Sequence, residues 1–387
     1  MKRMFQVLVI FTIIITTLTG CWDRVEINDV AFVIATGFDL EKSDDQRKYR
    51  VSAQIPLPGA MGGAEGGGGG TGSDRPFYVD SGVGRNIRES NENLQARMSR
   101  RLNFSHRRVI IIGDEIAREG FGPVVDVIAL QPQSRISAFI LVSNGPSITV
   151  LNSAPHLEKL PAEAIREMSK FGFSLTVKNI LNDIKRPGKD PMIPLVEVVK
   201  TQNQSPETQK EEIEIKKIGI LKNDKLVFHT NVEETQGVYW MLEKMRSKSV
   251  TIPIEDEGEV NVKIIEGKRR IHHTISQGIP EFEIHIDTES ILMENETNLN
   301  LEDEESYNKV RKSMENVIQS NISAIVEHTK SEKVDSFGLG WSLYRGENKY
   351  WKTVEDHWRD MLPDVKVKVT VDAEIQRLSN TGLKVAK

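Results

Sequence analysis

Hydrophobic and polar positions follow two different periods in the first half of the chain, and together they predict strands alternating with helices. Apolar runs at 30–39 and 49–57 flank the turn-forming Ser43-Asp44-Asp45 and predict an antiparallel hairpin. The same patterns predict further strands at 77–80, 109–114, 135–142 and 193–200, and helices at 84–102, 115–130, 162–171 and 177–184. This order favours an α/β layer in which helices pack on a mixed sheet.

The second half of the chain begins with a predicted hairpin and contains the longest predicted helix. The hairpin turns at Asn223-Asp224, and Asn231 suits the N-cap position of the helix that follows. Residues 250–286 hold at least four strand-like runs, as in a meander, separated by the turn signals Glu255-Asp256-Glu257-Gly258, Gly267 and Gln277-Gly278. An apolar stripe along the longest helix indicates that one of its faces packs on the sheet. The expected elements are strands at 213–222, 225–229 and 365–375, and helices at 233–247, 303–330 and 349–362.

These patterns predict an α+β fold with three domains, in which mixed and antiparallel sheets are flanked by helices. The expected divisions are a signal peptide at 1–20, an N-terminal α/β-type domain at 21–200, a small hairpin-plus-helix middle domain at 211–250, and a C-terminal α+β domain at 251–387 with the long helix 303–330. The stretch from Gly59 to Gly72 holds nine of the 28 glycines. Such a tract cannot bury enough surface to offset its ordering entropy, so we expect a flexible loop at 59–72.

The first 21 residues have the order of a secretory signal. Lys2 and Arg3 precede an uncharged run from Phe5 to Leu18, which ends in Leu18-Thr19-Gly20-Cys21. A helix that spans a bilayer needs about 20 apolar residues, so this run is short for an anchor and suits the core of a signal peptide. The thiol of Cys21 can be alkylated by a lipid, and the pattern looks like a bacterial lipobox. We therefore predict lipidation at Cys21 and a body outside the cytoplasm; a plain secreted protein and an uncleaved anchor are the alternatives.

Composition removes several classes of function. The chain of 387 residues has one cysteine, which cannot form an internal disulfide or supply the several thiolates of a zinc or iron–sulfur centre. Its formal net charge of −5 argues against general nucleic-acid binding, which relies on a clustered basic surface.

Candidate chemistry is sparse along the chain. His272 and His273 are adjacent, and His285 follows nearby, but neighbouring residues of a strand point to opposite faces and cannot share one ion without distortion. The sequence lacks the G-x-S-x-G and H-E-x-x-H patterns of common hydrolases. We therefore expect no enzyme activity, no metal and no cofactor.

Two groups of side chains are candidates for contact with partners. Several cations fall within twelve residues and could meet anionic headgroups or an acidic partner, although a solvated face is the simpler and favoured explanation; the candidate docking residues are Arg97, Arg100, Arg101, Arg107 and Arg108. Trp351 and Trp358 follow helical spacing with Val354 and Met361. This spacing favours a helix face buried in the last domain over an aromatic partner surface.

Four blocks of the sequence together carry a family resemblance. They are Cys21-Trp22-Asp23-Arg24-Val25-Glu26-Ile27-Asn28-Asp29 with Gly37-Phe38-Asp39, residues 105–120, residues 219–227, and the closing set of Asp335 to Gly340, Tyr350-Trp351-Lys352 and His357-Trp358. These blocks resemble the Ger(x)C family, the lipoprotein C subunits of spore germinant receptors in endospore-forming bacteria. The resemblance spans nearly the whole mature chain, and its opening and closing blocks are the most specific.

This resemblance implies three α+β domains, no known enzymatic chemistry, and assembly with the A- and B-type polytopic membrane subunits of a receptor that responds to nutrients and starts germination. It also implies a lipid anchor on the outer face of the spore inner membrane. An extracytoplasmic solute-binding or cell-wall-associated lipoprotein is the alternative hypothesis. A two-lobed solute receptor usually repeats a parallel α/β pattern in each half, which the proline-broken middle of this chain does not show.

Overall fold

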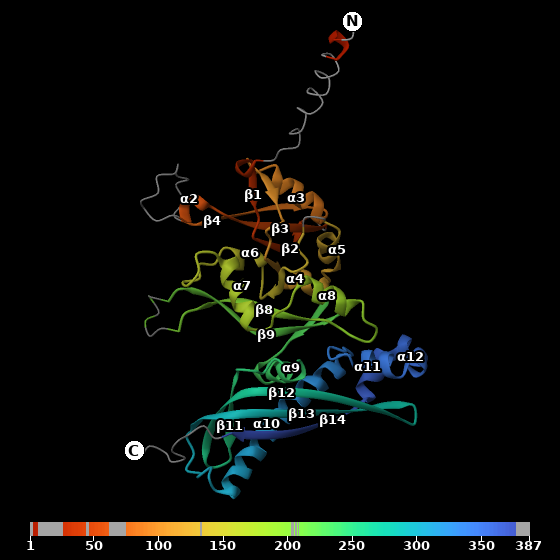
Figure 1. The fold of residues 1–387 in the computed structure, drawn as a ribbon. Helices are drawn as coiled ribbons and strands as arrows, with labels where there is room; N and C mark the ends of the chain where they lie inside the picture. The colour runs from red at the N-terminus through yellow and green to blue at the C-terminus, as the bar shows by residue number, and fades with distance from the viewer. Residues whose placement is uncertain are drawn as a thin grey trace.

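The computed structural model describes residues 3–6, 26–43, 46–61, 75–131, 134–202, 205, 207 and 209–376. Cys21 and most of the glycine-rich tract 59–72 lie outside the described residues. An eight-stranded sheet forms the first half of the molecule and a four-stranded sheet the second (Figure 1), and β1 pairs with β5 in a separate two-stranded sheet.

The eight-stranded sheet has the order β10-β9-β8-β7-β6-β2-β3-β4. Its four central strands, β8, β7, β6 and β2, run parallel, and antiparallel strands extend it on both sides. The strands of this half are β1 (Val30–Phe32), β2 (Ala35–Ser43), β3 (Gln46–Pro56), β4 (Phe77–Gly84), β5 (Arg101–Asn103), β6 (Val109–Ile112), β7 (Phe139–Ser143), β8 (Met192–Lys200), β9 (Glu211–Lys222) and β10 (Lys225–His229). The expected hairpins and mixed sheet are therefore present.

Helices cover both faces of this sheet because its central strand is apolar on both sides. In β6 all four residues are buried: Ile110 and Ile112 pack with α4, α5 and α8, while Val109 and Ile111 pack with α6 and α7. The helices of this half are α2 (Pro58–Met61), α3 (Ile87–Gln95), α4 (Asp114–Glu119), α5 (Gly122–Leu130), α6 (Ser147–Leu151), α7 (Pro161–Phe171) and α8 (Val177–Ile184). A strand apolar on both faces is typical of a sheet between two helical layers.

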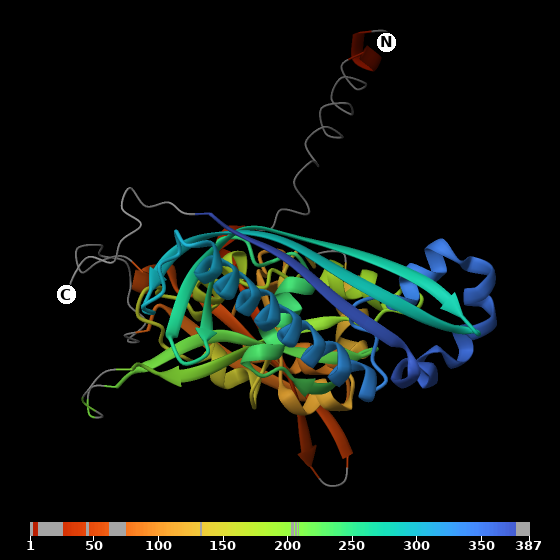
Figure 2. The same ribbon diagram turned by 90° about the horizontal axis from the view of Figure 1, so that it is seen from below.

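The four-stranded sheet has the order β11-β12-β13-β14, with β13 and β14 parallel and the other pairs antiparallel. Helix α10 packs one face along this sheet, as its apolar stripe predicts, and α11 to α13 gather at the far end of the long strands (Figure 2). The elements are α9 (Val232–Met241), β11 (Ser249–Ile254), β12 (Gly258–Ser276), β13 (Ile279–Asn295), α10 (Glu304–Ser331), α11 (Leu339–Gly346), α12 (Asn348–Val354), α13 (Trp358–Met361) and β14 (Lys366–Gln376).

Residues 211–250 differ from the separate middle unit that the sequence suggests. The hairpin of β9 and β10 continues the eight-stranded sheet, because β9 pairs with β8 from Lys200 and Glu211 to Met192 and Ile220. Helix α9 begins at the predicted N-cap, Asn231, and packs instead on α10. Its Gly237 lies so close to α10 that an added Cβ would meet the backbone oxygen of Asn321 at 2.1 Å. Residues 211–250 therefore connect the eight-stranded sheet to the part of the molecule that holds the four-stranded sheet.

One hydrophobic core runs through both halves. It joins Ile110 and Ile140 of the first sheet to Ile284 and Ile286 of the second, through side chains of α9 such as Trp240. The two sheets therefore share buried surface.

Candidate functional site

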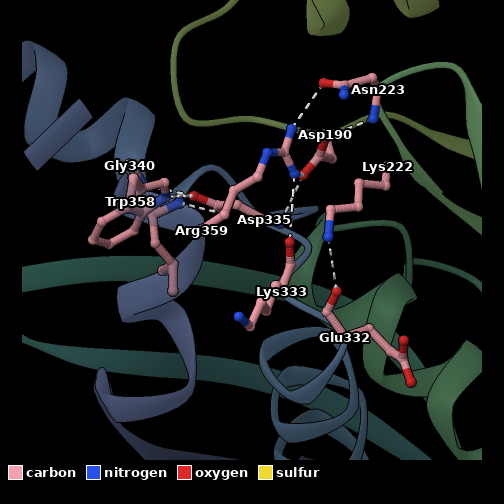
Figure 3. A network of polar contacts seen from close by, with 10 residues as sticks. Asp190, Lys222, Asn223, Glu332, Lys333, Asp335, Gly340, Trp358 and Arg359 are labelled. Carbon is pink, nitrogen blue, oxygen red and sulfur yellow. Dashed lines mark hydrogen bonds and ion pairs between the residues drawn. The ribbon is translucent and has the colours of Figure 1, made fainter. Parts of the chain in front are cut away.

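A network of polar contacts lies where the two halves of the molecule meet, and it centres on the buried Asp190 (Figure 3). Asp190 precedes β8 and is 1% exposed. Nη1 and Nη2 of Arg359, on α13, donate to its two carboxylate oxygens at 2.5 and 2.8 Å (Figure 3). The backbone N–H groups of Asn223 and Asp335 donate to it as well, both at 2.9 Å. One carboxylate thus ties the β9–β10 turn, the loop after α10 and helix α13 together.

Asp335 is the second buried carboxylate of this network. We call the network the joint; its side chains are Asp190, Asn223, Asp335, Trp358 and Arg359. It accepts the N–H groups of Leu339 at 2.9 Å and Gly340 at 2.7 Å, at the start of α11, and the indole Nε1–H of Trp358 at 2.9 Å (Figure 3). A carboxylate at a helix start is stabilised by the unpaired N–H groups there. Burial nevertheless dominates and raises the pKa of Asp335 to about 6.

Two glycines allow the backbones to approach at the joint. Gly188 has φ of +63°, and a Cβ there would lie 2.6 Å from the Cα of Gly340 and from the ring of Trp351. The N–H of Trp341 donates to the carbonyl of Gly188 at 3.1 Å. A side chain at either glycine would separate the two segments, so glycine is required by close contact here.

The arrangement suits mechanical attachment better than catalysis. Asp190 accepts four hydrogen bonds and Asp335 three, so every oxygen of the two carboxylates already accepts from at least one donor of the protein itself. A general base needs a lone pair that reaches the proton it removes. The joint therefore holds the two halves in a fixed geometry.

The five arginines proposed for docking do not form one surface. Arg107 is 2% exposed: its Nη2 donates to Ser134 at 2.8 Å, its guanidinium lies 5.6 Å from the ring centre of Phe104, and burial lowers its pKa to about 10. This burial removes Arg107 from any docking surface. Arg108 pairs with Glu163 of α7 at 2.7 Å. Arg97, Arg100 and Arg101 are exposed near β1 and β5.

The histidines are distributed as their strand positions predict. His272 is exposed, whereas His273 is half-buried on the opposite face and its Nδ1 lies 3.1 Å from the hydroxyl of Ser342. His285 instead lies beside Asp287 and Asp372, with ligand-type atoms within 4.8 Å of one another. Sequence reasoning missed this group because Asp372 comes from β14. Arg270 already pairs with Asp287 at 2.7 Å, so the acidic group has a cationic partner.

The tryptophans of the closing block lie in the core, as their helical spacing predicts. Trp351 is 3% exposed and Trp358 2%, and their rings meet edge to face with centroids 5.8 Å apart. They pack with Phe282, Leu339 and Leu343 in a cluster at the end of the long strands.

Comparisons with known proteins establish the family. Residues 23–198 match the family described as spore germination protein N-terminal domain, and residues 216–379 match the one described as spore germination B3/GerAC like, C-terminal. The protein YfkR of Bacillus subtilis (strain 168) is 32% identical over 380 residues, which covers 97% of each chain. The chain belongs to the Ger(x)C family of spore germination proteins.

Other Ger(x)C relatives align over nearly the full length. Spore germination protein KC of Bacillus subtilis (strain 168) is 24% identical over 404 residues, covering 99% of this chain and 97% of that one. The crystal structure of the GerBC protein superposes with a TM-score of 0.53 at 16% identity and covers 89% of this chain. The second comparison supports the α+β fold of a Ger(x)C protein.

The Ger(x)C resemblance blocks now have a structural meaning. The closing block from Asp335 to Gly340 supplies the carboxylate and the helix start of the joint, and Trp358 of the same block donates to that carboxylate. Among the described residues, no helix has both the length and the apolar character that a bilayer crossing requires.

Proposed function

We propose that this Ger(x)C chain is a non-enzymatic subunit of a spore nutrient germinant receptor, anchored by a lipid at Cys21. The observation that carries the proposal is the family membership, which extends over both halves of the chain. Membrane association follows if Cys21 is acylated, because two or three acyl chains hold a protein stably on a bilayer.

The chain would lie on the outer face of the spore inner membrane and assemble there with the A- and B-type polytopic subunits. The fixed joint around Asp190 supports this role, because a subunit that presents two halves to its partners in one orientation needs a rigid connection between them. Because every oxygen of Asp190 and Asp335 accepts from donors of the protein itself, the two carboxylates favour a structural role over a reaction.

The decisive experiment isolates the protein from its native membrane. A tagged chain is expressed from its own locus, the spore inner membrane is dissolved in mild detergent, and co-purifying proteins are identified by mass spectrometry. We expect two polytopic membrane proteins in stable proportion, and we expect spores that lack the gene to lose the response to one class of nutrient. Co-purification with a solute transporter or a wall-synthesis enzyme, with all nutrient responses intact, would favour the alternative lipoprotein function.

A further inference from the structure

The segment that follows the predicted lipid anchor is fixed to the body of the molecule. β1 pairs in parallel with β5, and the N–H of Val33 donates to the carbonyl of Asn103 at 2.9 Å. Val33 is fully buried, and Val30 and Ala31 are at most 9% exposed. Val33 and Ala31 belong to a small core with Leu94 and Leu102 at this end of the molecule. The chain is thus held in place from about Val30 onward.

This attachment limits how far the body can lie from an acylated cysteine. Cys21 precedes Glu26, the first described residue of this segment, by five residues. An extended chain advances at most about 3.6 Å per residue, so Glu26 lies within about 18 Å of Cys21. Given the lipid anchor of the proposed function, the end of the molecule that carries β1 and β5 must lie beside the bilayer. In Figure 1 the four-stranded sheet lies at the opposite end.

The segment that carries the exposed arginines is rich in cations although the chain as a whole is acidic. Residues 75–108 contain eight arginines, of which Arg107 is buried, three acidic residues and no lysine, whereas the whole chain has a formal net charge of −5. The exposed Glu26 and Asp29 lie at the same end, beside β1. Arg100 and Arg101 are exposed beside β5. The side chain of Arg97 is 63% exposed and pairs with Asp80 at 2.9 Å, which leaves part of its guanidinium accessible.

Apolar and aromatic side chains lie beside these arginines. Ile27 is 76% exposed and Tyr78 is 44% exposed. Both line an open groove of about 550 Å³, together with Leu57, Arg97 and Arg100. Exposed aliphatic and aromatic groups next to cations are typical of surfaces that lie in the interface between water and a membrane.

We propose that this end of the molecule is a bilayer-contacting face, on which Arg97, Arg100 and Arg101 bind anionic phospholipid headgroups while Ile27 and Tyr78 enter the interfacial layer. The occupant follows from the short reach of the anchor and from the charge of the surface. The face orients the whole molecule, so that the four-stranded sheet projects away from the membrane.

The test uses the mature chain from residue 21 with Cys21→Ser, so that no acyl chain contributes. Sedimentation with vesicles of phosphatidylcholine and phosphatidylglycerol is compared with sedimentation with phosphatidylcholine alone. We expect binding to the anionic vesicles that weakens as salt is raised, because each cation near an anionic surface strengthens binding about fivefold. The variant with Arg97, Arg100 and Arg101 all changed to Ser should bind about a hundredfold more weakly.

A matched control removes three cations elsewhere. Arg345, Lys349 and Lys352 are exposed on α11 and α12, and their replacement by Ser changes the net charge equally. We expect this control to bind like the parent. Thermal melting checks that all variants fold, and the pair Arg100→Glu and Arg101→Glu provides a second test that leaves the Arg97–Asp80 ion pair intact.

Three results would overturn the bilayer-contacting face: no binding to anionic vesicles, equal binding to neutral vesicles, or equal loss in the control variant. The vesicle test of this face and the test of acylation at Cys21 can fail independently of each other. If cells leave Cys21 unmodified while the unacylated chain still binds anionic vesicles through these arginines, the anchor fails and the face stands. If Cys21 is acylated but the vesicles are not bound, only the face fails.

Discussion

Asp190 illustrates how much of this molecule depends on a few side chains. Its carboxylate is buried, and its charge is balanced by the guanidinium of Arg359, which comes from the other half of the chain. The network also includes Asn223, whose Oδ1 accepts from Nη2 of Arg359 at 2.8 Å. The side chain of Arg359 is 35% exposed, so the cost of breaking this pair comes from leaving the buried Asp190 carboxylate without its counter-charge.

We predict that Arg359→Ala lowers the free energy of unfolding by about 3 kcal/mol, since it leaves the Asp190 carboxylate buried and unpaired. The control is Lys333→Ala, which removes the pair with Asp360 at 2.8 Å; these side chains are 46% and 72% exposed. Such a surface pair contributes less than about 1 kcal/mol. Urea denaturation of the mature chain measures the unfolding free energy of both variants. Equal losses in the two variants would show that the Asp190–Arg359 pair stabilises the fold no more than an exposed pair does.

The second residue-scale prediction concerns pH and Asp335. Because burial raises the pKa of Asp335 from 3.8 to about 6, the folded chain binds this proton more readily than the unfolded chain between these values. Stability contributed by this group is therefore greatest below about pH 4 and falls by up to about 3 kcal/mol as the pH rises to about 6.

Asp335→Asn should remove that part of the slope, although the variant itself is less stable because an amide NH₂ replaces an acceptor facing N–H donors. Unfolding free energies measured from pH 4 to 7 test the slope and not the absolute value. The pKa of Asp39 is also raised by burial, so some slope remains in the variant. An unchanged slope in Asp335→Asn would assign the effect to other groups.

At the scale of elements, the sequence predicts the existence of helices and strands better than their ends. Gly267 suggests a turn within 250–286, but it lies inside β12, where an added Cβ would be 3.0 Å from the Trp240 ring of α9. The helix expected at 115–130 is broken at Gly120, with φ of +116°, and Asp224 accepts the N–H of Gly122 beyond the break at 2.8 Å. In both places a tertiary contact decides the outcome, and local patterns do not contain it.

The helix expected at 349–362 is likewise divided into α12, a short 3₁₀ turn and α13, yet its aromatic face is buried as predicted. We expect Trp351→Ala and Trp358→Ala each to lower the unfolding free energy by about 3 to 5 kcal/mol through lost burial and cavity formation. Trp341→Ala, at a half-buried ring stacked on Tyr344, should cost clearly less.

Trp358→Phe separates packing from hydrogen bonding in the same element. It keeps an aromatic ring but removes the Nε1–H that Asp335 accepts at 2.9 Å, and we expect a loss of about 1 to 3 kcal/mol. Thermal and urea unfolding measure all four variants. Unchanged melting of the Trp351 or Trp358 alanine variant, together with loss of co-purifying membrane proteins, would place that ring in an interface.

At the scale of the whole molecule, the α+β class and the mixed sheet follow from the sequence, whereas the joint does not. Asp190 and Arg359 are 169 residues apart, and nothing local to either carboxylate or cation indicates its partner. Arg107 shows the same limit, because its neighbours Arg100, Arg101 and Arg108 are exposed while it is buried. Periodicity gives the face of a residue within its element, but the partners of that face come from the tertiary arrangement.

We predict that Cys21→Ala abolishes acylation and stable membrane retention, because no other residue can carry the thioether. Incorporation of labelled lipid and membrane fractionation measure this. A high-salt wash should release any mutant protein that the basic face alone retains, since surface electrostatic attraction is screened by salt. Full retention of a cleaved, unacylated mutant after that wash would contradict the anchor assignment.

The pairing of β8 with β9 has a consequence for any attempt to divide this protein. The first family match ends at residue 198, in β8, and the second begins at residue 216, in β9. The boundary between them therefore separates two strands that are neighbours in one sheet. A fragment ending near residue 205 would expose the hydrogen-bonding groups of β8 as an open edge, together with the apolar surface that β9, β10 and α9 cover. Unprotected edges of this kind pair with other copies. In size-exclusion chromatography we therefore expect the fragment to elute as aggregates and the full mature chain to elute without aggregates.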